Sequence, residues 1–123
     1  MQLTETDGGT FDAEVTERTI PVVVDFYADW CRPCRGMTPI VHALAVSLEG
    51  DVHFVKVNID QSPELARRFD VRSIPTFVRF DGGQVTCVVV GARTERGLRD
   101  AMGFRPRASE PLAHRWWSTR ARR

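Results

Sequence analysis

The sequence lacks several features that would indicate other classes of protein. No apolar run approaches the length of about 20 residues that a membrane-spanning helix needs. The first seven residues do not combine a basic flank with an apolar stretch, so no secretory signal is visible and we expect the protein in the cytoplasm. A glycine-rich dinucleotide fingerprint is also missing, which argues against a nicotinamide cofactor bound by this chain itself.

Cysteine and lysine are both scarce. The three cysteines, Cys31, Cys34 and Cys87, are too few for a framework of paired structural disulfides. Lys56 is the single lysine, and we draw no function from the resulting bias toward arginine. With 42% apolar and 27% charged residues, the 123-residue chain has an ordinary globular composition. Its length allows one domain with a sufficient core.

The most informative segment leads from an apolar run directly into a pair of cysteines. Residues 21–28 read as a buried central strand, and the pattern from 33 to 48 is helical. Cys31 and Cys34 therefore lie on the first turn of a helix, where the N-terminal sulfur faces backbone N–H groups that stabilise a thiolate. This arrangement predicts dithiol–disulfide exchange, with Cys31 as the nucleophile and Cys34 as the resolving cysteine.

Two other interpretations of the cysteine pair remain open at this point. The pair supplies half of a zinc site, which needs about four nitrogen or sulfur ligands, or it forms a purely structural disulfide. No second ligand pair supports zinc, because the third cysteine and the histidines are scattered. Pro33 between the two cysteines suits a redox loop better than a metal-binding turn.

Asp25 interrupts the otherwise apolar strand before the cysteines. Burying a carboxylate without a partner is costly, so the residue makes sense if it stays protonated and exchanges a proton with Cys34. The alternative is an ion pair between Asp25 and Lys56 on a neighbouring strand. The two interpretations are compatible, and we favour the catalytic one.

The rest of the chain predicts an α/β fold with a mixed central sheet, a short first strand and helices on both faces. A short strand near residues 3–5 precedes a helix that Thr10 is expected to cap. Later strands are expected at 52–59, 76–80 and 84–90, and later helices begin at Pro63 and, with Thr94 as the cap, at 95.

Three segments resemble the thioredoxin family in type, order and spacing: the stretch from Asp25 to Cys34, which contains Trp30-Cys31-Arg32-Pro33-Cys34, the later Arg72-Ser73-Ile74-Pro75-Thr76, and Val90-Gly91-Ala92. The resemblance runs from about Leu3 to Met102. A bare pair of cysteines three positions apart would be weak, but the combination is highly specific. Thioredoxin is a well-known example of redox chemistry at such a cysteine pair. The match therefore implies both this chemistry and the thioredoxin fold.

The resemblance also implies roles for individual residues. The Ile74–Pro75 bond is expected to be cis, with its loop against the cysteines, and Lys56 is expected beside Asp25. Trp30, Ile74, Gly91 and Ala92 match the family's apolar substrate-docking surface. Arg32 stands where glycine is commonest in the family; it either favours the Cys31 thiolate or is a solvated side chain with a small effect. Tyr27 stands where many members have a second tryptophan.

The expected activity is the reduction of disulfides in protein substrates. The resemblance implies recharging by a thioredoxin reductase, and NADPH then belongs to that partner while this chain binds no cofactor or metal. We expect a monomer with no specific nucleic-acid or membrane partner. The alternatives are a more oxidising exchanger that serves a dedicated client, and a binding module whose cysteines are incidental, which the intact motif disfavours.

Two features fall outside this picture. Cys87 lies in a very apolar strand at the expected sheet edge, where a buried, inert thiol is the simplest expectation and a disulfide-linked dimer the alternative. We place the domain at residues 1–103 and a flexible basic tail at residues 104–123, which hold six Arg and one Glu, a net charge of +5. The tail's arginines and Trp116-Trp117 suit an acidic partner, a membrane surface or nucleic acid, and a solvated extension is the simpler alternative.

Overall fold

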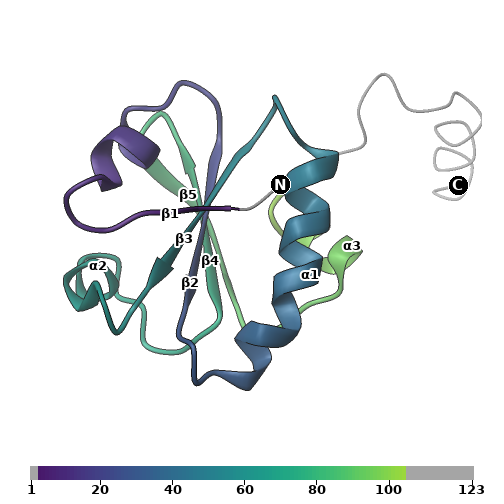
Figure 1. Ribbon diagram of the computed structural model, residues 1–123. Coiled ribbons are helices and arrows are strands. Elements are labelled where there is room, and N and C mark those ends of the chain that lie inside the picture. Colours follow the sequence, from purple (N-terminus) through teal and green to yellow (C-terminus); the bar gives the residue numbers. More distant parts are fainter. Residues whose placement is uncertain (1–2, 105–123) are drawn as a thin grey trace, which may run out of the picture.

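A computed structural model describes residues 3–104 of the chain. The elements follow the order strand, helical turn, strand, helix, strand, helix, strand, strand, helix (Figure 1). They are β1 (Thr4–Glu5), η1 (Asp12–Thr16), β2 (Val22–Tyr27), α1 (Arg32–Ser47), β3 (His53–Asn58), α2 (Pro63–Arg68), β4 (Thr76–Asp81), β5 (Gln84–Val90) and α3 (Glu95–Ala101). The predicted α/β class and the short first strand are confirmed.

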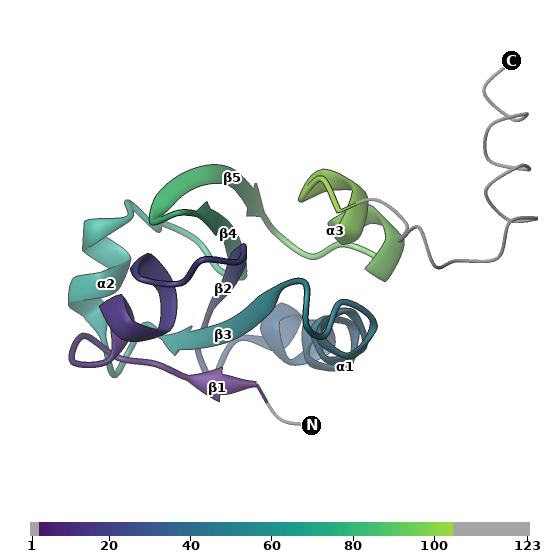
Figure 2. The same cartoon turned by 90° about the horizontal axis from the view of Figure 1, so that it is seen from above.

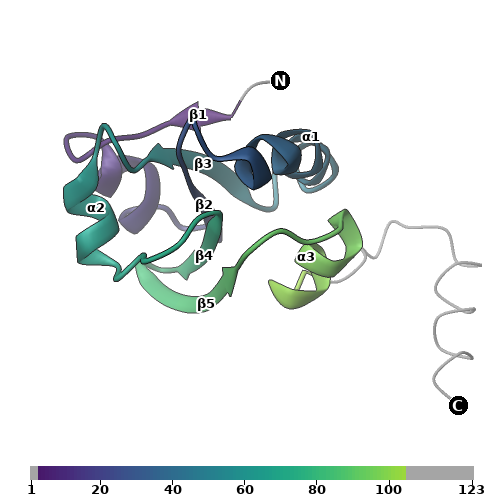
Figure 3. The same ribbon diagram turned by 90° about the horizontal axis from the view of Figure 1, so that it is seen from below.

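The strands form one mixed sheet in the order β1-β3-β2-β4-β5 (Figure 3). The first three run parallel, whereas β4 is antiparallel to both β2 and β5. The strand β2 is central and buried, as its run of apolar residues predicts. Register pairs Asp25 with Lys56 on β3 and with Phe77 on β4.

Helices cover both faces of the sheet (Figure 2). One face packs against α1 and α3 through a cluster that includes Val23, Met37, Leu44, Phe77 and Leu98. The opposite face packs against η1 and α2 through the second cluster, Phe11, Val15, Val22, Val24, Phe26, Val55, Val57, Leu65, Val78 and Phe80. Alternate residues of β2 contribute to the two clusters because successive side chains of a strand point to opposite faces.

The helix expected after Thr10 is a single π-helical turn, and Thr10 does not cap it. Phe11 occupies the N-cap position without a side-chain hydrogen bond. The Thr10 hydroxyl instead accepts a hydrogen bond from the backbone N–H of Asp7 at 3.2 Å, while the Asp7 carboxylate accepts one from the N–H of Thr10. The polar side chains therefore order the preceding loop, and Phe11 and Val15 anchor the turn to the sheet, both fully buried.

The C-terminal helix α3 begins as predicted, with the Thr94 hydroxyl accepting a hydrogen bond from the Gly97 N–H. Packing continues one residue beyond Gly103. Phe104 is buried in the cluster under α1 and α3, and the Arg79 guanidinium lies over its ring, 4.5 Å from the centroid. Phe104 thus packs with the domain, although it is the first residue of the predicted tail. The tail residues 105–123 lie outside the described part of the chain.

Cys87 lies on β5, at the edge of the sheet. Its side chain is half-buried against the cluster under α3, and its thiol donates a hydrogen bond to the Ala101 carbonyl at 3.1 Å. The thiol therefore faces the molecule's own helix rather than standing free on the sheet edge.

Candidate active site

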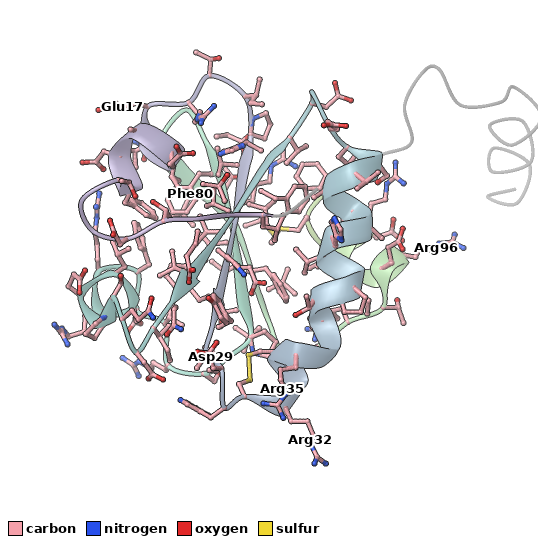
Figure 4. The ribbon with its side chains drawn as sticks, in the orientation of Figure 1. Glu17, Asp29, Arg32, Arg35, Phe80 and Arg96 are labelled. Carbon is pink, nitrogen blue, oxygen red and sulfur yellow. A yellow bond between two sulfur atoms is a disulfide. The ribbon has the colours of Figure 1, made fainter. Side chains whose placement is uncertain are left out.

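A disulfide joins Cys31 and Cys34 at the beginning of α1 (Figure 4). Cys31 is the N-cap residue, with extended backbone angles, and its Sγ accepts a hydrogen bond from the Cys34 N–H at 3.2 Å. Pro33 occupies the first turn, where its missing N–H costs no helical hydrogen bond. The sulfur of Cys31 is therefore placed at the positive end of a 16-residue helix, a position that favours a thiolate after reduction.

The two sulfurs are shielded on most sides. Cys31 and Cys34 are only 5% and 6% exposed and pack against Ala28, with Tyr27, Ile59 and Ile74 around them. The Ile74–Pro75 bond is cis, as the resemblance predicts, and the Ile74 carbonyl oxygen lies 3.9 Å from the Cys31 Sγ. The loop before β4 is thus one wall of the site.

A surface groove of about 360 Å³ opens beside Cys31. Of the residues expected here, Trp30, Arg32, Pro33 and Ile74 line it. Trp30 is 66% exposed, and its indole N–H donates to the Asp60 carboxylate at 2.8 Å, which fixes the ring at the groove's rim. A large, oriented aromatic side chain on the surface is typical of a docking site.

The two remaining docking residues lie differently from each other. The Gly91 N–H donates to the Pro75 carbonyl at 2.8 Å, which places Gly91 directly against the loop of the cis bond. Ala92 is exposed and does not line the groove. Arg72 and Ser73 belong to the segment that carries the family resemblance but were given no role of their own, and both line the groove. The signal for both residues is their place directly before Ile74-Pro75 in that segment.

Two arginines of α1, Arg32 and Arg35, lie next to the two cysteines along the chain. Arg32 points away from the body of the molecule, whereas Arg35 folds back toward Asp29 (Figure 4). The Arg35 guanidinium donates to the Asp29 carbonyl at 2.7 Å. Arg32 therefore adds an exposed positive charge next to Cys31, and solvent screens that charge.

Behind the disulfide lies a second, larger cavity of about 860 Å³. Asp25, Cys34 and Lys56 all line it, so the structure brings together the acid, the inner cysteine and the lysine. This arrangement agrees with the predicted neighbourhood of the three residues. Glu5 and Tyr27 also line this second cavity, which we call the inner cavity. That these two residues lie beside Asp25 and Lys56 was not apparent from the sequence.

Asp25 has the most perturbed carboxyl of the site. It is 8% exposed, and its Oδ1 has no hydrogen-bond partner among the described residues. Burial raises the pKa of Asp25 from 3.8 to about 7, and the positive charge of Lys56 only partly opposes this effect. An acid with such a pKa exchanges its proton readily near neutral pH.

The alternative ion pair with Lys56 is not formed in the described residues. Asp25 and Lys56 are register partners on β2 and β3, yet the Lys56 ammonium lies over the Tyr27 ring, 5.3 Å from its centroid. Lys56 thus influences Asp25 through its charge without forming an ion pair with it.

Two further properties of the described residues bear on the candidate chemistries. Residues 3–104 contain no cluster of three or more His, Cys, Asp or Glu side chains arranged to hold a metal ion. In the same range, no helix is long and apolar enough to cross a membrane. Cys31 and Cys34 form a disulfide with each other.

Comparison with known proteins gives one consistent result. The family model for thioredoxin matches residues 2–103. Thioredoxin 1 of Nostoc sp. is 48% identical over 83 residues, which cover 68% of this chain and 78% of that protein. Thioredoxin 1 of Synechococcus elongatus is 48% identical over 93 residues, covering 76% and 87%. The thioredoxin of Porphyra purpurea is 39% identical over 102 residues, covering 83% and 95%.

Proposed function

The chain belongs to the thioredoxin family, and from that premise we propose how its residues divide the work of disulfide reduction. The protein is a dithiol–disulfide oxidoreductase that acts as a protein-disulfide reductase. The observation that carries the assignment of roles is the position of Cys31. It is the N-cap of α1, beside an open groove, whereas Cys34 faces the inner cavity.

Cys31 is the attacking cysteine. In the reduced protein its thiolate attacks one sulfur of a substrate disulfide at the groove. A bond forms between Cys31 and that sulfur, the substrate's S–S bond breaks, and the other substrate sulfur leaves as a thiolate that takes a proton. The N-terminal position on α1 supports this role because the helix dipole and the Cys34 N–H stabilise the negative charge on Cys31.

Cys34 resolves the mixed disulfide. Asp25 in its ionised form takes the proton of the Cys34 thiol, and the resulting thiolate attacks Cys31. The Cys31–Cys34 bond forms, the bond from Cys31 to the substrate breaks, and the substrate leaves with both sulfurs reduced. A pKa of about 7 for Asp25 supports this proton transfer, because both protonation states are populated near neutral pH.

The groove residues position the substrate. Trp30 and Ile74 offer apolar surface in the groove that Cys31 also lines. Outside the groove lining, Gly91, which is hydrogen-bonded to the Pro75 carbonyl, and the exposed Ala92 follow directly after β5 and are proposed to extend that surface. The backbone of Ile74 is available to pair with an extended segment of the substrate. Pro75 shapes the wall of the site, Lys56 influences Asp25, and Arg32 and Pro33 complete the helix turn that presents the cysteines.

The oxidised protein then needs a source of electrons. We propose that a thioredoxin reductase supplies them from NADPH, that both proteins work in the cytoplasm, and that this chain acts as a monomer on disulfide-containing proteins. Family membership supports a reductase partner and disulfide substrates in general.

Insulin reduction in the presence of dithiothreitol tests the assignment. The wild-type protein should accelerate the appearance of insulin aggregates, and Cys31→Ser should abolish the acceleration. Cys87→Ser is the matched control, since it removes the cysteine that lies against α3 and should leave the rate unchanged. A Cys31→Ser protein with full activity would refute the proposed function.

A further inference from the structure

Three ionisable side chains form a row across the first three strands of the sheet. Register pairs Glu5 of β1 with Lys56 of β3, and Lys56 with Asp25 of β2. Residues paired in this way point to the same face of a sheet. All three line the inner cavity together with Cys34. The row thus leads from the exposed edge of the sheet to the buried acid beside the resolving cysteine.

Tyr27, the only tyrosine in the sequence, holds this row together. It lies two positions after Asp25 on β2 and therefore on the same face of the sheet. Its hydroxyl donates a hydrogen bond to the Glu5 carboxylate, and its ring lies beneath the Lys56 ammonium, 5.3 Å from the centroid. Cations are attracted to the face of an aromatic ring at such distances. Burial and the contact with Glu5 both raise the pKa of the Tyr27 phenol, which therefore stays protonated and donates.

The place of Lys56 over this ring matters for Asp25. A cation in direct contact with an aspartate lowers the pKa of that carboxyl by about 1 to 3 pH units. In the described residues Lys56 makes no ion pair with Asp25, and the Asp25 Oδ1 has no hydrogen-bond partner. The pKa of Asp25 accordingly stays high, at about 7, because burial outweighs the charge of Lys56.

We propose that Tyr27 is a positioning residue for the resolving step: anchored by Glu5, its ring keeps the Lys56 ammonium away from Asp25, which remains able to exchange a proton with Cys34 near neutral pH. This inference rests on the proposed role of Asp25 in resolving the mixed disulfide. It adds two residues, Tyr27 and Glu5, neither of which contacts the reacting sulfurs through a hydrogen bond.

Besides Tyr27, the other titratable or charged side chains that line the inner cavity with Asp25 come from four segments. The helix α1 contributes Arg35 and His42, beside the disulfide-bonded Cys34; the segment after β2 contributes Asp29, β3 contributes Lys56 and β1 contributes Glu5. Arg35 is bound to the Asp29 carbonyl, His42 is exposed, and the β4 partner of Asp25 is the apolar Phe77. Lys56 is therefore the cation that is in register with Asp25 and whose position a neighbouring side chain controls.

The test measures the titration of the Asp25 carboxyl directly by carbon NMR, in the oxidised full-length protein. In this state Cys34 does not titrate, and no turnover is needed. Tyr27→Leu removes both the ring and the hydroxyl, so Lys56 is released and the Asp25 midpoint should fall by about one pH unit. Tyr27→Trp restores a ring and should return the midpoint close to the wild-type value.

A second background identifies the cause of the shift. In Lys56→Met protein, Tyr27→Leu should leave the Asp25 midpoint unchanged, because the cation that moves is gone. Glu5→Gln, a change at an exposed residue, should lower the midpoint in the wild-type background by a smaller amount and provides the test if Tyr27→Leu does not fold.

An unchanged midpoint in the folded Tyr27→Leu protein, or an equal shift with and without Lys56, would overturn the proposal and leave Tyr27 a packing residue. Because the titration involves no substrate, its outcome is separate from the insulin assay. A protein can therefore show the shift and lack reductase activity, which would contradict the proposed function and not the role of Tyr27 in positioning Lys56.

Discussion

Replacing Asp25 with asparagine should stabilise the fold, and the gain should grow as the pH rises. Burial raises the pKa of Asp25 to about 7 in the folded protein, whereas its ordinary value is 3.8. Below pH 3.8 both the folded and the unfolded chain carry the proton, and the folded state bears no ionisation cost. As the pH rises to about 7 the unfolded chain releases the proton first, so the wild-type fold loses stability until its own carboxyl ionises. Asparagine does not ionise and escapes this loss.

The magnitude follows from the two pKa values. Each pH unit of difference corresponds to about 1.4 kcal/mol, so the interval from 3.8 to about 7 gives about 4 kcal/mol at full ionisation. The buried amide has a desolvation cost of its own, but that cost is the same at every pH. The diagnostic quantity is therefore how the difference in unfolding free energy between Asp25→Asn and the wild type changes with pH. Guanidinium unfolding of both oxidised proteins, followed by circular dichroism from about pH 4 to about pH 8, measures it.

Asp81→Asn is the matched control. Asp81 forms an ion pair with Arg79 at 2.9 Å, and the hydrogen bond from Arg79 holds the pKa of Asp81 below its usual value. Its carboxylate therefore stabilises the fold above the unfolded pKa and loses that effect as the pH falls. The difference in unfolding free energy between Asp81→Asn and the wild type should therefore change with pH in the opposite direction to the difference for Asp25→Asn. A difference for Asp25→Asn that is flat with pH, or that matches the sign of Asp81→Asn, would refute the reasoning and make Asp25 an ionised partner of Lys56.

Three further predictions concern the site and the chain end. Asp25→Asn should slow the release of substrate from the mixed disulfide more than the initial attack, because Cys34 loses its proton acceptor; stopped-flow kinetics at neutral pH separates the steps, and equal slowing of both would contradict it. Arg32→Gly should make the Cys31–Cys34 dithiol–disulfide couple more reducing, since a cation that favours the Cys31 thiolate is lost. Equilibration with a glutathione buffer measures the redox equilibrium constant, and a constant unchanged at all salt concentrations would leave Arg32 without a redox role. Truncation after Phe104 should preserve insulin reduction, whereas truncation after Gly103 should cost about 2 kcal/mol of stability because a buried ring is lost; unfolding of the longer fragment would place the tail within the domain.

Much of the fold was predictable because the strongest local patterns agree with the packing. The apolar run of β2 has no polar face, which is what a central strand covered by helices on both sides requires. The N-cap of α3 depends on Thr94 and its neighbour three residues on, so it too could be read locally. The cis Ile74–Pro75 bond was predicted by the family resemblance alone, since nothing in the local composition distinguishes it from a trans bond.

Other features depend on contacts between distant segments. Thr10 was expected to cap a helix. Its hydroxyl instead accepts a hydrogen bond from the Asp7 N–H, and its own N–H donates to the Asp7 carboxylate, so Thr10 is bound within the preceding loop. Pro39 has no N–H and cannot donate a helical hydrogen bond to the Arg35 carbonyl. The helix α1 nevertheless continues through Pro39, because the buried face of the helix packs on the sheet. The contact between Tyr27 and Glu5 joins residues 22 positions apart and could not be inferred from either residue alone.

The measurement that tests the central claim most directly is the trapping of a mixed disulfide by Cys34→Ser. Without the resolving cysteine the substrate should stay attached, and peptide mapping by mass spectrometry should find it bound to Cys31. The Cys31→Ser protein should trap no substrate, because Cys31 lines the groove where the substrate docks, whereas Cys34 lines the inner cavity instead. Substrate attached to Cys87 in the Cys34→Ser protein, or equal trapping by Cys31→Ser, would contradict the assignment of Cys31 as the nucleophile.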